Sequence, residues 1–262
     1  MFQFCSLYSG SSGNCSFVQT DSTKILIDAG QSAKKIEEAL TCINVDPFSI
    51  NGILITHEHS DHIKGLGIFS KKFNIPVYAN KETWDAMQTQ REKVKKENIK
   101  YFTFNKFSIG DIDIRPFAIP HDAANPCGFN IYNKDKKMSI ATDIGHIDKE
   151  IIEHLSKSSF LLLEANYEPE ILKCSKYPFL LKSRISGPNG HLSNSDAGKA
   201  ISYLASNGLN KVMLGHLSRE NNFPELAYKT VVEELIENNV PTSSLNLSVA
   251  NRFEASPMID IV

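Results

Sequence analysis

The sequence has little net charge, few cysteines and no long apolar run. Its 28 lysines and arginines nearly balance 30 aspartates and glutamates, for a formal net charge of -2. The protein therefore has no overall basic field, and any nucleic acid would have to be held by a local basic patch. No segment approaches the roughly 20 consecutive apolar residues of a membrane span, so we expect no membrane partner.

The five cysteines are scattered and odd in number, and no two of them form a Cys-x-x-Cys pair. Such usage is typical of reduced thiols in a cytosolic protein. Residues 1–4 lack the positive lead and apolar core of a secretory signal. We therefore expect a cytoplasmic protein. With 41% hydrophobic residues, the chain is expected to fold as one globular domain spanning residues 1–262, and its oligomeric state stays open.

Apolar patterning predicts an alternation of strands and helices, which is typical of the α/β class. Strands are predicted at 2–8, 15–19, 24–28, 53–55, 75–79, 107–109, 112–119, 128–132, 138–142, 160–163, 211–214, 244–249 and 258–262. Helices are predicted at 32–40, 81–88, 149–157, 196–206 and 223–238. The mixed charges of residues 91–100 indicate a solvated helical face.

The clearest chemical signal follows the apolar run 53–55. The next residues are polar and include four candidate metal ligands within six positions, namely His57, His59, Asp61 and His62. An extended chain would place His57 and His59 on the same side, because side chains alternate along a strand. Three imidazoles and a carboxylate suit zinc, with manganese or iron when more oxygen ligands join. A solvated loop without an ion is the alternative, and so dense a ligand set argues against it.

Acids and histidines recur where other predicted strands end. His121, Asp143, Glu164 and His216 each end or closely follow an apolar run. In open α/β sheets, ligands bind beyond the strand ends, where loops converge. We therefore expect these residues to share one site with the first four. Asp28 ends another strand and is expected to orient a ligand histidine from behind.

The number of candidate ligands suggests two divalent ions, zinc or manganese. In this hypothesis one ion is held by His57, His59 and His121, the second by Asp61, His62 and His216, and Asp143 bridges them. Two ions can activate a water and stabilise both the attacking and the leaving oxygen of an in-line displacement. Asp61 could also accept the proton of the attacking water.

Residues 171–195 form a candidate nucleic-acid patch. This stretch contains no acidic residue and carries Lys173, Lys176, Lys182 and Arg184, interleaved with Tyr177 and Phe179. Basic side chains bind phosphates and aromatic rings stack on bases, which makes Lys182 and Arg184 candidate substrate contacts. An exposed loop whose aromatic residues pack inward is the alternative.

Two further segments could approach a phosphate. The small residues of loop 9–14 include Ser11, Ser12 and Asn14, although a plain tight turn explains this loop nearly as well. Ser193 and Asn194 precede the predicted helix 196–206, and a helix N-terminus favours anions.

His191 stands just before that helix. Paired with Glu164, it could donate a proton to a leaving oxygen. Asp61, Glu164 and His191 are thus the candidate catalytic residues.

The motif His57-x-His59-x-Asp61-His62 resembles the signature of the metallo-β-lactamase superfamily. The resemblance implies a four-layer αβ/βα sandwich with one or two metals held between the sheet edges. It does not select a substrate, because thioesterases, lactonases, phosphodiesterases and nucleases of the superfamily share the motif.

Within the superfamily, the segments 164–166 and 190–193 resemble those that serve proton transfer in tRNA 3′-processing endonucleases. The chain departs from those enzymes at Leu163 and Leu192 and lacks their long tRNA-gripping arm.

A resemblance over nearly the whole chain is to the WalJ (YycJ) family of bacterial exonucleases. It rests on segments 9–14, 27–30, 56–65, 121–124, 190–194 and 214–222. The family implies a metal-dependent 5′-to-3′ exonuclease that acts on double-stranded DNA ends and is linked to mismatch-repair proteins. Whether His121 or Glu164 completes the metal shell stays open.

Other functions remain as alternatives. A thioester or lactone hydrolase would use the same ions without a basic patch, and an RNA-processing nuclease would share both features. A nucleic-acid-binding protein with a structural metal would have a closed ligand set, whereas the surplus of candidate ligands suggests open positions.

Overall fold

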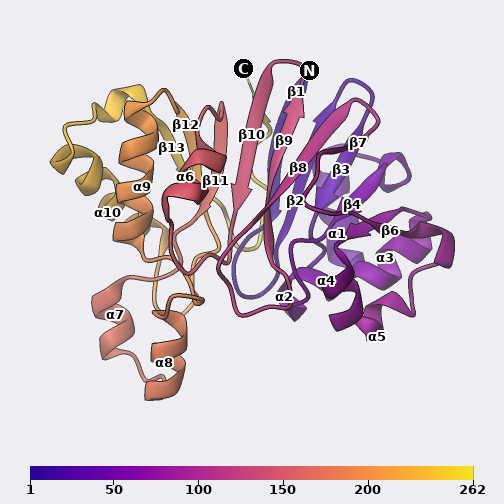
Figure 1. The fold of residues 1–262 in the computed structure, drawn as a ribbon, viewed down its shortest axis with the longest axis horizontal. Coiled ribbons are helices and arrows are strands. Elements are labelled where there is room, and N and C mark those ends of the chain that lie inside the picture. Colours follow the sequence, from indigo (N-terminus) through magenta and orange to yellow (C-terminus); the bar gives the residue numbers. More distant parts are fainter. Residues whose placement is uncertain (262) are drawn as a thin grey trace.

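The structure, a computed structural model, describes residues 1–261. Within them, the strands form two seven-stranded sheets that lie face to face, and helices cover the outer face of each sheet (Figure 1). The layers therefore run helix, sheet, sheet, helix. This arrangement confirms the α/β class and the four-layer αβ/βα sandwich.

The first sheet has the strand order β14-β1-β2-β3-β4-β5-β6. Its strands are β1 (Phe2–Tyr8), β2 (Cys15–Thr20), β3 (Lys24–Ile27), β4 (Gly52–Leu54), β5 (Val77–Ala79), β6 (Ile99–Tyr101) and β14 (Ile259–Asp260). From β3 to β6 the neighbours are parallel, which requires crossover connections. These connections hold α1 (Ala33–Cys42), α2 (Ser60–Ile63), α3 (Leu66–Phe73), α4 (Lys81–Ala86), α5 (Gln88–Arg91) and the 3₁₀ turns Pro47–Ser49 and Lys96–Asn98.

The second sheet has the order β13-β12-β11-β10-β9-β8-β7. Its strands are β7 (Phe107–Ile109), β8 (Ile112–Ala118), β9 (Cys127–Asn133), β10 (Lys136–Ala141), β11 (Phe160–Glu164), β12 (Lys211–Gly215) and β13 (Asn246–Val249). The strands from β10 to β13 are parallel. Their connections hold α6 (Lys149–Leu155), α7 (Pro169–Cys174), α8 (Phe179–Ile185), α9 (Asn194–Ser206), α10 (Pro224–Glu237) and the 3₁₀ turn Thr242–Ser244.

Apolar side chains fill the space between the two sheets as well as the two helix-sheet interfaces. Phe4 of β1 meets Phe160 of β11 across the central layer, with ring centroids 4.7 Å apart. Because both faces of each sheet are covered, strands such as β11 are buried along their whole length. The loops at the sheet edge are therefore held by a rigid scaffold.

Three segments differ from the sequence prediction. Residues 91–100 do not form a helical face: they end in a 3₁₀ turn and in β6, because β5 offers this segment a strand to pair with. Residues 169–185, for which no helix was predicted, contain α7 and α8. The last predicted strand is shorter than expected, and its final residue, Val262, lies outside the described residues.

The parallel strands bring the predicted site residues to one edge. Asp28 follows β3, His57 follows β4, Asp143 follows β10, Glu164 ends β11, and His216 follows β12. Loops beyond the ends of parallel strands are where α/β folds place their ligand sites. No helix within residues 1–261 is long and apolar enough to cross a membrane.

Candidate metal centre

Three of the site residues have a backbone conformation that is uncommon for residues with a Cβ atom. Asp28, Asp143 and His216 have φ values of 63°, 57° and 52°, in the left-handed region. Such conformations carry strain and persist where the surrounding structure determines them. At each of the three residues the chain turns sharply as it leaves the strand, so the backbone conformation directs the side chain into the site.

A first ligand cluster contains His57, His59 and His121, whose candidate ligand atoms all lie within 4.8 Å of one another. The ring centroid of His57 lies 4.7 Å from that of His59 and 5.1 Å from that of His121. The Nε2 atom of His121 lies 3.2 Å from Nδ1 of His59. Three imidazoles at this spacing can hold one divalent cation.

A second cluster contains Asp61, His62 and His216. The Oδ2 atom of Asp61 lies 3.6 Å from Nε2 of His62 and 3.4 Å from Nε2 of His216. Both rings are buried, and the Asp61 side chain is 23% exposed. This cluster therefore faces solvent through its carboxylate.

Asp143 lies between the two clusters. Its Oδ2 is 3.1 Å from Nε2 of His62, while its Oδ1 is 3.6 Å from Nε2 of His121 and 3.5 Å from Nε2 of His216. One carboxylate thus has an oxygen near members of both clusters.

Most of the histidine rings are oriented through their Nδ1 atoms. Nδ1 of His121 donates a hydrogen bond to the Gly190 carbonyl, which can only accept, at 3.0 Å. Nδ1 of His62 lies 2.7 Å from Oδ2 of Asp28, and Nδ1 of His216 lies 2.8 Å from Oε1 of Glu164. A proton on Nδ1 leaves the lone pair of each neutral ring on Nε2, which faces the other candidate ligands.

His57 is oriented through a relay. Its Nδ1 lies 3.0 Å from the hydroxyl of Thr56, which in turn lies 2.9 Å from Oδ2 of Asp28. Asp28 also accepts a hydrogen bond from the Thr56 backbone N–H at 2.9 Å. One buried carboxylate thus orients His62 directly and His57 through Thr56.

Two buried atoms show that these residues fit a metal. Nε2 of His57 and Oδ2 of Asp143 make no hydrogen bond within residues 1–261, although both are shielded from solvent. Nε2 of His62 lies 3.1 Å from that oxygen but has no proton to donate when Asp28 holds the proton on Nδ1. A buried polar atom without a partner is costly, and both atoms are ordinary ligands for divalent cations. The donor set, nitrogen with carboxylate oxygen, suits zinc or manganese.

The charges of the site are strongly coupled. Burial opposes a charge on His216, but Asp143, Asp61 and Glu164 raise its pKa to about 10. Burial likewise opposes a charge on Glu164, but His191 and His216 lower its pKa to about 2. Burial holds the pKa of His57 well below its usual value. A bound cation would displace protons from the rings, as metals do when they bind histidine.

Glu164 lies behind the ligands. Its Oε1 is 2.8 Å from Nδ1 of His216 and 2.9 Å from Nδ1 of His191, and its Oε2 accepts the backbone N–H groups of Ile144 and Leu192. Both oxygens are therefore engaged, whereas Nε2 of His121 faces the first cluster. This geometry favours His121 over Glu164 as the ligand that completes that cluster.

The small-residue loop 9–14 is attached to the metal centre at both ends. Ser9 Oγ accepts the backbone N–H of His216 at 2.8 Å, and Asn14 Nδ2 lies 3.0 Å from Nε2 of His62. Ser11 and Ser12, between these anchors, are exposed. The structure thus brings Asn14 into the site and leaves the two serines at its rim.

Ser193 and Asn194, which are predicted to contact substrate, have partners within the chain. Ser193 Oγ caps α9 by accepting the backbone N–H of Asp196 at 3.1 Å. Asn194 is fully buried, and its Nδ2 donates to Glu168 and Asn222. The structure gives both side chains internal partners and does not bring them to the surface.

Lys182 and Arg184, predicted to contact substrate, also have partners within the chain. Arg184 makes two hydrogen bonds to the carboxylate of Asp122, next to His121. Lys182 Nζ donates to the Lys173 carbonyl at 2.7 Å. Both side chains retain surface exposure, so a substrate could still reach them.

Sequence reasoning missed Thr56 and Asn166. The Thr56 hydroxyl links Asp28 to His57 through hydrogen bonds, and Asn166 Nδ2 donates a hydrogen bond to the His216 carbonyl at 2.8 Å. Asn166 could have been suspected because it stands two residues beyond the strand that ends in Glu164. Thr56 carries no comparable signal, since a threonine before a histidine is unremarkable.

Replacing Asp28 tests whether the buried carboxylate sets the ligand rings. We expect Asp28→Asn to weaken zinc binding about 10- to 100-fold, the range seen when a group that orients a ligand is lost. Competition with a chromogenic chelator measures the affinity. Asp260→Asn, an exposed carboxylate at the sheet edge, is the matched control and should bind zinc normally. Unchanged affinity in a folded Asp28→Asn protein would contradict this role.

Comparisons with known proteins agree with this geometry. The β-lactamase superfamily domain matches residues 23–217. The chain is 41% identical over 239 residues to Exodeoxyribonuclease WalJ of Streptococcus pneumoniae, covering 90% of this chain and 89% of the relative. It is 36% identical over 235 residues to Exodeoxyribonuclease YycJ of Bacillus anthracis, covering 89% of each chain.

Solved structures share the fold at low sequence identity. Zn²⁺-bound PqqB from Methylobacterium extorquens superposes with a TM-score of 0.71 at 13% identity, over 97% of this chain and 99% of that one. The short form of human tRNase Z superposes with a TM-score of 0.68 at 15% identity, over 99% of each chain. The chain therefore belongs to the β-lactamase superfamily, within the family of WalJ and YycJ, and is a metal-dependent hydrolase.

Proposed function

We propose that the protein is an exonuclease that degrades double-stranded DNA from its 5′ ends with two divalent ions, zinc or manganese. The observation that carries the proposal is the pair of ligand clusters that share Asp143. The exodeoxyribonuclease names of relatives that align with about nine-tenths of the chain support DNA as the substrate. Resemblance to the WalJ family supports the 5′-to-3′ direction.

We assign the ligands to the two ions by these two clusters, whose members do not overlap; the candidate ligands also group as His57, His62 and Asp143, and as Asp143, Glu164, His191 and His216. One ion would be held by His57, His59 and His121, the other by Asp61, His62 and His216, with Asp143 between them. Two such ions supply activation of a water and stabilise the attacking and leaving oxygens of phosphodiester hydrolysis. Asp61 is the one ligand of the second cluster whose side chain is partly exposed, and it could take the proton of the attacking water.

His191 would donate a proton to the leaving oxygen. Its Nδ1 is 2.9 Å from Oε1 of Glu164, which leaves Nε2 free, and its side chain is 17% exposed. Glu164 holds the ring in place and stabilises the protonated form, as the carboxylate behind a catalytic histidine does. The same carboxylate oxygen also contacts His216, so it couples the proton donor to the second cluster.

The cellular setting is part of the proposal. We place the enzyme in the cytoplasm and in mismatch repair, with mismatch-repair proteins as partners. Resemblance to the WalJ family and the absence of a disulfide pattern in the sequence support this setting.

A linear duplex labelled at either end tests the activity. In manganese or zinc we expect label at the 5′ end to be released first, and we expect no release by an Asp61→Ala, His62→Ala double variant, which loses two ligands of one cluster. Gel analysis of timed samples reports the order of release. A folded, metal-replete protein that digests no nucleic acid would contradict the proposal and favour a small-molecule hydrolase.

Replacing His191 tests the proton donor. We expect His191→Ala to lower kcat about 100- to 10,000-fold, the usual contribution of a general acid or base, with the bound-metal content unchanged. Single-turnover digestion and elemental analysis measure the two quantities. His146→Ala is the matched control, because His146 is exposed and bonds the same loop at the Pro188 carbonyl. A fall in metal content equal to the fall in activity would instead assign His191 to metal binding.

A further inference from the structure

Helices α7 and α8 form an arm that projects from the body of the molecule (Figure 1). The arm has its own small apolar core, in which Tyr167, Leu172 and Ile185 are buried and Tyr177 and Leu181 partly so. This core of its own gives the arm a defined shape, although the arm packs little against the sheets.

The arm is joined to the metal centre on one side. It leaves the sheet just after Glu164 and returns just before His191. Arg184 of α8 bonds Asp122, the neighbour of His121, and the Gly190 carbonyl at the arm's base accepts a hydrogen bond from His121 itself. The arm is therefore fixed relative to the ligand clusters.

The tip of the arm is apolar and exposed to solvent. Phe179 and Leu180 open α8, and each is 80% exposed, more than any other large hydrophobic residue of the described chain. A single exposed apolar side chain needs no explanation, but an adjacent pair at the end of a projecting element indicates a contact surface.

The surroundings of Phe179 suit an anion with an apolar part. The ring lines a cavity of about 460 Å³ with Tyr167, Leu172, Lys173 and Lys182. No acidic residue lines this cavity, and none occurs between residues 171 and 195. Lys173 has only a loose surface pair, 3.8 Å from Glu170. Phosphates could lie against the lysines while a base contacts the ring.

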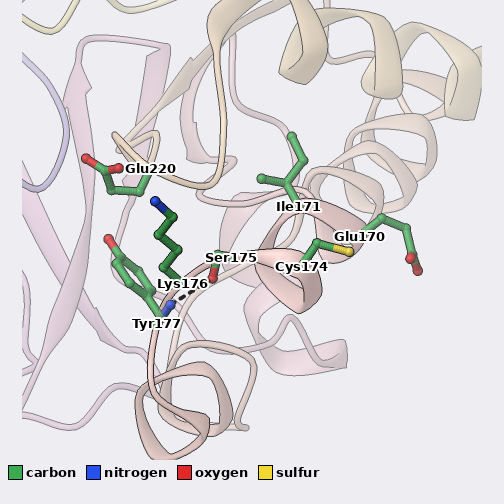
Figure 2. A pocket seen from close by; sticks show the side chains of 7 residues that line it. All are labelled: Glu170, Ile171, Cys174, Ser175, Lys176, Tyr177 and Glu220. Carbon is green, nitrogen blue, oxygen red and sulfur yellow. Dashed lines mark hydrogen bonds between the residues drawn. The ribbon is translucent and has the colours of Figure 1, made fainter.

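The other face of α7 differs in charge. There a second cavity is lined by Lys176 and Tyr177 together with the carboxylates of Glu170 and Glu220 (Figure 2). Carboxylates would repel a phosphate backbone. A nucleic acid would therefore bind on the Phe179 face.

Most ligands of the metal centre lie below the surface, and the centre reaches solvent through Asp61, whose side chain is 23% exposed. His57 and His62 are fully buried, and Asp143 and His216 are 2% and 1% exposed. Enzymes that bind a nucleotide in a pocket take it out of the duplex by unstacking or unpairing it. A duplex end presents a flat base pair, on which an aromatic ring can stack whatever the sequence.

We propose that Phe179 and Leu180 form a wedge that stacks on the terminal base pair of a DNA duplex and parts its strands. The 5′ strand then enters the metal centre unpaired, while Lys173 and Lys182 contact the backbone. This inference rests on the proposed exonuclease function and adds how a blunt end is recognised and opened.

Comparing digestion of paired and unpaired duplex ends distinguishes a strand-parting wedge from a general DNA-binding contact. We expect the Phe179→Ala, Leu180→Ala double variant to lose about tenfold or more in kcat/KM on a blunt duplex, the scale of one lost stacking contact. It should lose less than about twofold on the same duplex with several unpaired 5′ nucleotides, where no base pair has to be opened. Phe253→Ala removes another exposed ring and is the control.

A binding measurement makes the test independent of cleavage. A duplex with 2-aminopurine at its terminal pair is mixed with the cleavage-deficient Asp61→Ala, His62→Ala protein. We expect the 2-aminopurine fluorescence to rise as the terminal base pair unstacks. The rise should be absent when Phe179 and Leu180 are also replaced by alanine. It should return when Phe179 is instead replaced by tryptophan and Leu180 is kept.

Three results would overturn the wedge. They are equal losses on blunt and frayed ends, an unchanged fluorescence rise in the alanine variant, and a dimer in sedimentation that the alanine variant abolishes, which would assign the tip to a second copy. If the unsubstituted protein opens the duplex end but cleaves neither substrate, the wedge stands and the proposed exonuclease activity fails.

Discussion

The metal centre depends on buried carboxylates that lie behind its histidines. Asp28 holds His62 directly and His57 through Thr56, and Glu164 holds His216. With Nδ1 of each ring engaged from behind, the Nε2 atoms are left to face the interior of the site. Without these partners the same histidines would be free to rotate, and the ligand clusters would have no fixed shape.

The fold supplies what these pairs need. Parallel strands from two sheets end at one edge, and sharp left-handed turns at Asp28, Asp143 and His216 direct their side chains inward. The insertion between β11 and β12 then adds α7 and α8 beside the centre. The candidate ligands thus lie where the strands of the rigid sheets end, whereas Phe179 and Leu180, the proposed substrate contacts, lie on the projecting arm.

Much of the fold could be predicted from the sequence, because buried strands are apolar along their length and the His-x-His-x-Asp-His motif indicates the superfamily. The same patterns grouped the candidate ligands, and the structure brings those groups together. His57 and His59 lie side by side as predicted, although β4 ends at Leu54 and both histidines stand in the loop that follows it. The roles of Thr56, Asn194 and Arg184 depend on partners distant in sequence, namely Asp28, Glu168 and Asp122, which no local pattern reveals.

The most direct test of this account is anomalous diffraction at the zinc edge from crystals of the zinc-loaded protein. The account predicts two peaks, one among His57, His59 and His121 and the other among Asp61, His62 and His216, with Asp143 between them. A single anomalous peak, or peaks that lie among other residues, would contradict this account.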